Sequence, residues 1–155
     1  MPNACQGAVT RPLTKTAPVA DTSIPQTGTG EFDAGVVDLN IGETVTYTLT
    51  IDVPEGSGLV VLTDSLPTGL EAISAEVTLI PATVSSANLA QGDTDASAFL
   101  TISAGGDTVT ADFGLLTSTG VDDSAAEVTR QVEGQVTAIV TDIAANIAGA
   151  PLTNT

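Results

Sequence analysis

The stretch Glu43–Val53, with the sequence ETVTYTLTIDV, decides the fold class of this chain. Apolar side chains at every second position, from Val45 to Val53, alternate with threonines and an aspartate. This period of two is typical of a β-strand with one face in a core and the other in water. The stretch therefore predicts a long, half-buried strand that follows a turn at Asn40–Gly42.

The flanking residues continue the β pattern. Leu59–Thr63 (LVVLT) is a short continuous apolar run, which predicts a strand in the centre of a sheet. In Ile73–Ile80, every second residue from Ile73 to Leu79 is apolar, and this phase is predicted to face the core. The remaining predicted strands cover 8–17, 97–103, 107–113, 128–143 and 152–155, with 97–113 forming a hairpin and 81–96 a polar excursion.

The number and spacing of these segments predict the architecture. About eight or nine strands separated by turns indicate an all-β fold, an antiparallel two-sheet Ig-like β-sandwich. Residues 1–30 are rich in Thr, Pro and Gly and are predicted to form an extended N-terminal arm that carries the first strand and a loop. Residues 31–155 are predicted to form the sandwich itself.

Charge and composition exclude several classes of function. The chain has 155 residues, with 3 Lys+Arg, 19 Asp+Glu, no His and a net charge of −16. Nucleic acids and anionic membranes bind through Lys and Arg, so neither is an expected partner. Without His and with a single Cys, His/Cys zinc sites and Ser-His-Asp or Cys-His catalysis are excluded. No apolar run approaches the roughly 20 residues that span a bilayer.

Four stretches together resemble the tandem-repeat domain of large bacterial surface proteins. They are IGETVTYTLT at 41–50, VPEG at 53–56, LTDSLPTGL at 62–70 and LTNT at 152–155. The chain is also similar to the isopeptide-forming modules of pili, in which a lysine on the first strand precedes these motifs. The resemblance covers about residues 10–155 and implies an extracellular, Ig-like stalk or adhesin repeat. Residues 1–5 match nothing in the pattern.

The resemblance also implies a covalent bond between Lys15 and Asn154, with Asp64 as the acid. In such a bond a neutral lysine amine attacks an asparagine carboxamide, while a buried carboxyl polarises the carboxamide and moves protons. The strand phases allow this arrangement, because each of the three residues is in phase with apolar neighbours on its strand. Lys15 is the only lysine of the chain.

Purely structural roles explain the same three residues. Asp64 before Ser-Leu-Pro is a good turn residue whose carboxylate caps backbone amides. Asn154 could satisfy a strand end, and Lys15 could extend to the surface beside carboxylates.

Acidic loops offer a second kind of site. Asp93 with Asp95, and Asp122 with Asp123, lie in two loops that could converge on one Ca²⁺, which binds several oxygen ligands. A solvated acidic surface explains the same residues without a metal. No other cofactor is expected.

The function expected from these observations is that of a structural module of an extracellular bacterial surface, adhesin or filament protein. Its partners would be neighbouring copies or repeats, and its only catalysis would be the autocatalytic isopeptide step. An alternative is a self-assembling filament subunit in which the 1–30 arm adds a strand to a neighbour. A ligand-binding adhesin tip is a further alternative, but the 81–96 excursion has no aromatic residue to form a binding platform.

Overall fold

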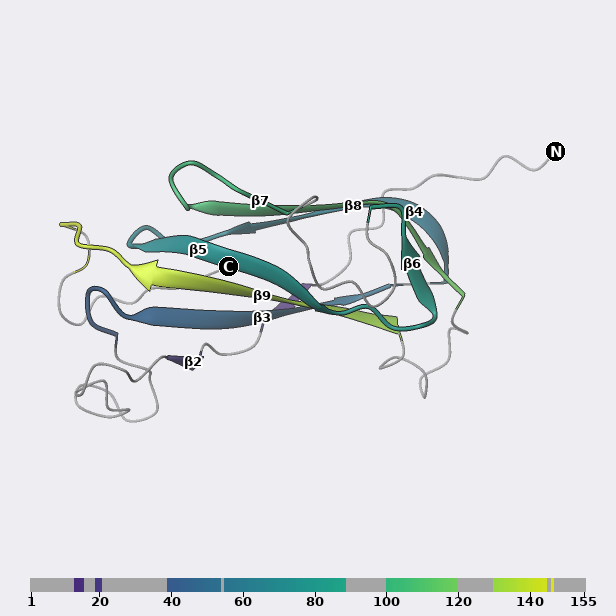
Figure 1. The fold of residues 1–155 in the computed structure, drawn as a ribbon, viewed down its shortest axis with the longest axis horizontal. Helices are drawn as coiled ribbons and strands as arrows, with labels where there is room; N and C mark the ends of the chain where they lie inside the picture. The colour runs from purple at the N-terminus through teal and green to yellow at the C-terminus, as the bar shows by residue number, and fades with distance from the viewer. Residues whose placement is uncertain are drawn as a thin grey trace.

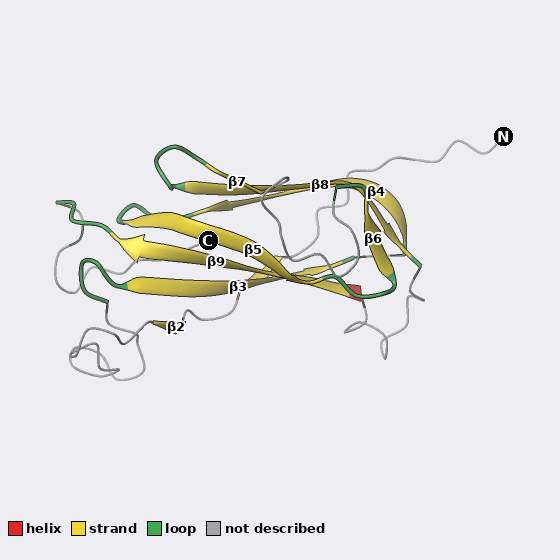
Figure 2. Cartoon of the chain, viewed as in Figure 1, coloured by secondary structure: helices red, strands yellow, loops and turns green. Residues whose placement is uncertain are grey.

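A computed structural model of the chain shows two layers of strands (Figures 1 and 2). It describes residues 13–15, 19–20, 39–53, 55–88, 100–119, 130–144 and 146. The strands are β1 (Leu13–Lys15), β2 (Val19–Ala20), β3 (Thr44–Asp52), β4 (Gly56–Ser65), β5 (Leu70–Leu79), β6 (Val84–Ser86), β7 (Leu100–Ile102), β8 (Thr108–Ser118) and β9 (Gln131–Val140). Within this described part, no helix is long and apolar enough to cross a membrane.

The described strands form two antiparallel sheets, which confirms the predicted all-β sandwich. The first sheet has the order β1-β3-β9-β5, and β2 also pairs with β3. The second has the order β4-β8-β6, and β7 pairs with β8. β1 and β2 belong to the predicted N-terminal arm, so the described parts of that arm lie within the first sheet of their own chain.

β3 has the alternation that its sequence predicts. Val45 is 0% exposed, and Tyr47 and Leu49 are each 4% exposed, because these three side chains face the second sheet. The threonines between them face outward, where the hydroxyl of Thr46 lies 3.0 Å from the hydroxyl of Thr137 on β9. β9 mirrors this pattern, with buried side chains at Val132, Val136, Ala138 and Val140.

The core fills the space between the sheets in two adjoining clusters. One contains Tyr47, Leu49 and Val136 from the first sheet together with Val109 of β8. The other surrounds Phe113, which is 2% exposed and is the largest fully buried side chain in the described part of the protein. Most other core residues are small and aliphatic, so many modest contacts hold the sheets together.

The prediction that Leu59–Thr63 forms a central strand is wrong. These residues lie in β4, which stands at the end of the order β4-β8-β6 among the described strands. An apolar run resembles a strand buried on both faces. Here, however, Leu59 is 83% exposed and Val61 is 61% exposed, because both side chains point away from the core.

Part of the predicted core phase of 73–80 is also wrong. Ile73 is 52% exposed and Leu79 is 41% exposed, whereas Val77 of the same predicted phase is 4% exposed. The pairing of β5 with β9 shifts between Ala72 and Ser74 and again between Val77 and Leu79. Each irregularity inserts one extra residue on β5, Ile73 or Thr78, so residues of the same phase on either side of it fall on opposite faces of the sheet.

Two other predictions concern the second sheet. The hairpin around 104–106 is confirmed, because β7 and β8 pair on either side of that turn. The polar excursion 81–96, however, contains β6, which pairs with the far end of β8 and buries Val84. The predicted last strand, 152–155, lies outside the described residues.

Candidate crosslinking site in the sandwich interior

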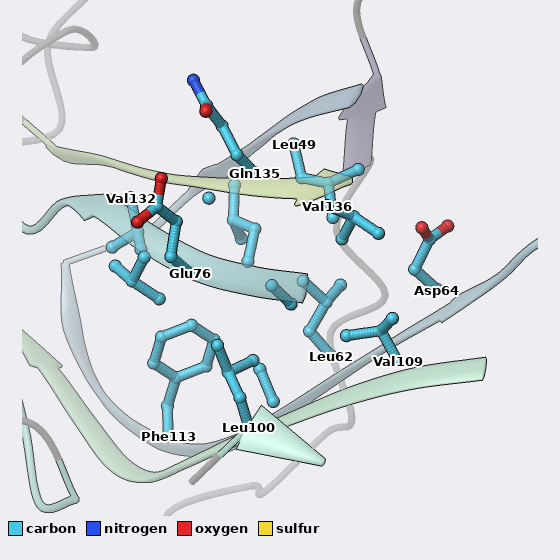
Figure 3. Close-up of a pocket in the computed structure, with 15 residues that line it drawn as sticks. Leu49, Leu62, Asp64, Glu76, Leu100, Val109, Phe113, Val132, Gln135 and Val136 are labelled. Atoms are coloured by element: carbon cyan, nitrogen blue, oxygen red, sulfur yellow. The ribbon is translucent and has the colours of Figure 1, made fainter. Parts of the chain in front are cut away.

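Asp64 lies in the interior of the sandwich although it is an acidic residue. It is the penultimate residue of β4, pairs in register with Val109 of β8 and is 3% exposed. It therefore occupies a strand position rather than the turn position that the structural alternative assumes. Figure 3 shows its carboxylate directed from β4 toward the opposite sheet, on the side where Leu49 and Val136 lie.

A small cavity adjoins this carboxyl group. It has a volume of about 30 Å³ and is lined by Asp64, by Leu62 and Val109 of the second sheet and by Leu49 and Val136 of the first, among other residues. Most of the other lining residues are apolar, but Glu76 of β5 and Gln135 of β9 also line the cavity (Figure 3). A carboxyl group in such surroundings is poorly solvated, and a low local dielectric strengthens its interactions with the dipoles and charges around it.

Tyr47 of the first sheet is a polar neighbour of Asp64. It lies two residues before Leu49 on β3, on the same buried face. Desolvation by burial raises the pKa of the Tyr47 phenol, and the negative charge of Asp64 raises this pKa further. The Tyr47 phenol and the Asp64 carboxyl group are therefore close enough to interact across the two sheets.

The backbone of Lys15 is placed at the same level of the sandwich. β1 pairs antiparallel with β3, and Lys15 is directly opposite Leu49 in this register. Residues directly opposite each other in an antiparallel pair share a face of the sheet. Position 15 therefore belongs to the face that carries Leu49, and Leu49 lines the cavity that also contains Asp64. Asn154 lies outside the described residues.

The acidic residues proposed for calcium gain no support. Asp93, Asp95, Asp122 and Asp123 all lie outside the described residues. Elsewhere, no group of three or more metal-binding side chains occurs in the part of the chain that the structure describes.

Sequence reasoning missed the role of Glu43, the acid of the motif at 41–50. Glu43 is 2% exposed, and its Oε2 accepts a hydrogen bond of 2.7 Å from the backbone N–H of Asn40. The backbone N–H of Glu43 in turn donates to the carbonyl of Asn40, and Gly42 between them has φ of 89°. Glu43 thus closes the turn that starts β3, a role that a glycine followed by an acid at a strand start could have signalled.

A second unforeseen contact involves Asn146. Its Nδ2 donates to the carbonyl oxygens of Gly69 and Thr141, at 2.9 and 2.7 Å. The side chain covers Gly69, whose φ is 106° and which has no room for a Cβ beside Asn146. This contact fastens the segment after β9 onto the turn between β4 and β5.

Comparisons with known proteins identify no relative. No family model, no curated protein and no solved structure matches the chain.

Proposed function

We propose that this chain is a structural module of a bacterial extracellular surface or filament protein, clamped by an isopeptide bond between Lys15 and Asn154. The register of β1 carries the proposal, because it sets Lys15 opposite Leu49, beside the cavity that Asp64 lines. The backbone position of the only lysine of the chain is therefore at the same level of the sandwich as a buried acid.

The chemistry needs only groups of this chain. The Nζ of Lys15 attacks the Cγ of the Asn154 carboxamide, a new C–N bond forms, and the old C–N bond breaks to release ammonia. Asp64 accepts a proton from the attacking amine and returns one to the leaving nitrogen. The reaction needs the Lys15 amine in its neutral form, and most of the residues that line the cavity beside Asp64 are apolar.

The pairing of the arm favours the clamp over strand addition to a neighbour. β1 and β2 pair with β3 of the same chain, so these parts of the arm are already placed in a sheet. A bond from β1 to the last strand would carry tension directly between the two ends of the module. The hydrogen-bond ladders of both sheets would then bear little of that tension.

Intact mass under denaturing conditions tests the proposal. The folded protein is expected to weigh about 17 Da less than its sequence, because one ammonia is lost. Lys15→Arg and Asp64→Asn are expected to restore the full sequence mass. Asp112→Asn makes the same acid-to-amide change at an exposed position of β8 and should keep the reduced mass. A parent protein at full sequence mass would refute the clamp.

A further inference from the structure

The outer surface of β4 has an unusual composition for so acidic a protein. Leu59 is 83% exposed, Val61 is 61% exposed, and Leu115, directly opposite Leu59 on β8, is 49% exposed. Together these three side chains form an apolar patch, called here the β4 patch. Large apolar side chains that gather on a surface mark sites of contact.

The backbone of β4 offers a second binding element. β4 is at the end of its sheet among the described strands, and its first four residues are exposed on both faces. An added Cβ at Gly56 or Gly58 would meet nothing within 4 Å. An edge strand presents unsatisfied N–H and C=O groups that pair readily with another strand.

β4 also lacks the prolines, lysines and exposed charges that often protect such an edge. Its sequence GSGLVVLTDS contains no proline and no lysine, and its single charged residue, Asp64, is 3% exposed. The chain as a whole carries a net charge of −16. This strand is thus an edge along which a second copy of the chain can approach without setting acidic side chains of the strand against each other.

From these observations we infer that β4 is a self-association edge, where the β4 strands of two copies pair antiparallel about a two-fold axis. Residues that face outward alternate with residues that face inward along β4. When Val60 of one copy lies opposite Val60 of the other, Leu59 of each copy therefore lies opposite Val61 of the other copy. Both β4 patches then form one continuous apolar surface. This inference is independent of the proposed isopeptide bond.

The expected association is weak and tightens with salt. One strand pair with a few apolar contacts is small beside a standard interface, so dissociation constants in the micromolar to millimolar range are expected. Two acidic copies repel each other at long range, and salt screens this repulsion. Added sodium chloride should therefore strengthen the dimer, whereas a contact made by pairs of opposite charges would weaken.

Sedimentation of the full chain over a range of concentrations tests the inference. The parent should form a dimer and stop there, because the symmetric contact uses both edges. Leu59→Glu and Val61→Glu should each weaken the dimer at least about tenfold, by placing like charges in the interface. Ile73→Glu, the same kind of change at an exposed residue of β5, should leave dimerisation unaffected.

Three results would overturn the inference. A parent that stays monomeric at all concentrations and salt levels has no such edge. Dimers that persist unchanged in both Leu59→Glu and Val61→Glu use another surface. Open-ended polymers in place of dimers would indicate that a different segment of a neighbour, such as its N-terminal arm, occupies β4.

Discussion

β3 and β4 are strands of similar length in opposite sheets, but their patterns are reversed. On β3 the apolar side chains face the core and the threonines face water. On β4 a carboxylate faces the core at Asp64, whereas Leu59 and Val61 face water. β3 serves the stability of the sandwich. The two reversals on β4 do not, and they are the basis of the two proposals, a crosslink inside and a contact surface outside.

The largest expected effect concerns the proposed crosslink beside the buried Asp64. Lys15→Arg cannot form the amide, so the chain would lose the proposed link between residues 15 and 154. By analogy with a disulfide that closes a loop of this size, the loss should reduce the free energy of unfolding by about 5 kcal/mol. For a domain of this length the melting temperature should fall by about 10 to 20 °C. Calorimetry measures both, and a variant that melts with the parent would contradict the clamp.

A matched pair of leucines tests the comparison itself. Leu49→Ala on β3 removes a buried side chain and should destabilise the protein by about 3 kcal/mol. Leu59→Ala on β4 removes a side chain that is 83% exposed, and the stability of the monomer should change by less than about 0.5 kcal/mol. Denaturant unfolding at low protein concentration measures both. Equal losses in the free energy of unfolding would contradict the contrast between a buried leucine on β3 and an exposed leucine on β4.

The smallest expected effect is a pH dependence set by Tyr47. Its pKa is raised in the folded state above the usual tyrosine value of about 10, so the folded protein holds the phenolic proton more tightly than the unfolded chain does. The resulting stabilisation is fully present below pH 10 and is lost as pH rises through the folded-state pKa. Tyr47→Phe should remove this alkaline loss.

The Tyr47 titration can be followed directly, because Tyr47 is the only tyrosine and the chain has no tryptophan. The tyrosinate absorbance of the folded protein should appear at higher pH than that of the unfolded chain. Asp64→Asn should reduce the difference, because it removes the charge that adds to the desolvation. Coincident titrations of the folded and unfolded chains would contradict the raised pKa of Tyr47.

Sequence alone predicts the strands that have one clear role. β3 and β9 follow from alternation, because each has one face in the core along its whole length. β4 does not, because an apolar run is compatible both with burial on two faces and with an exposed edge, and only its pairing decides between them. The predicted core phase of β5 is wrong where the pairing of β5 with β9 is irregular. The three-residue strand β6 is defined only by its pairing with β8.

The same limit applies to the site. The burial of Asp64 is within reach of sequence analysis, since it shares its phase with Leu62 on one strand. Its proximity to Tyr47 is not, because these residues lie on different sheets and only the packing of the two sheets brings them together. The turn role of Glu43 and the contact between Asn146 and Gly69 likewise depend on backbone geometry that the sequence does not state.

Trypsin digestion of the denatured protein, followed by mass measurement, tests the central claim most directly. Trypsin cleaves after Lys and Arg but not before Pro, so Arg11 before Pro12 is spared and only Lys15 and Arg130 are targets. The account predicts one branched product, because a bonded Lys15 is not cleaved and residues 131–155 stay attached through Asn154. Release of three separate linear fragments, 1–15, 16–130 and 131–155, would contradict it.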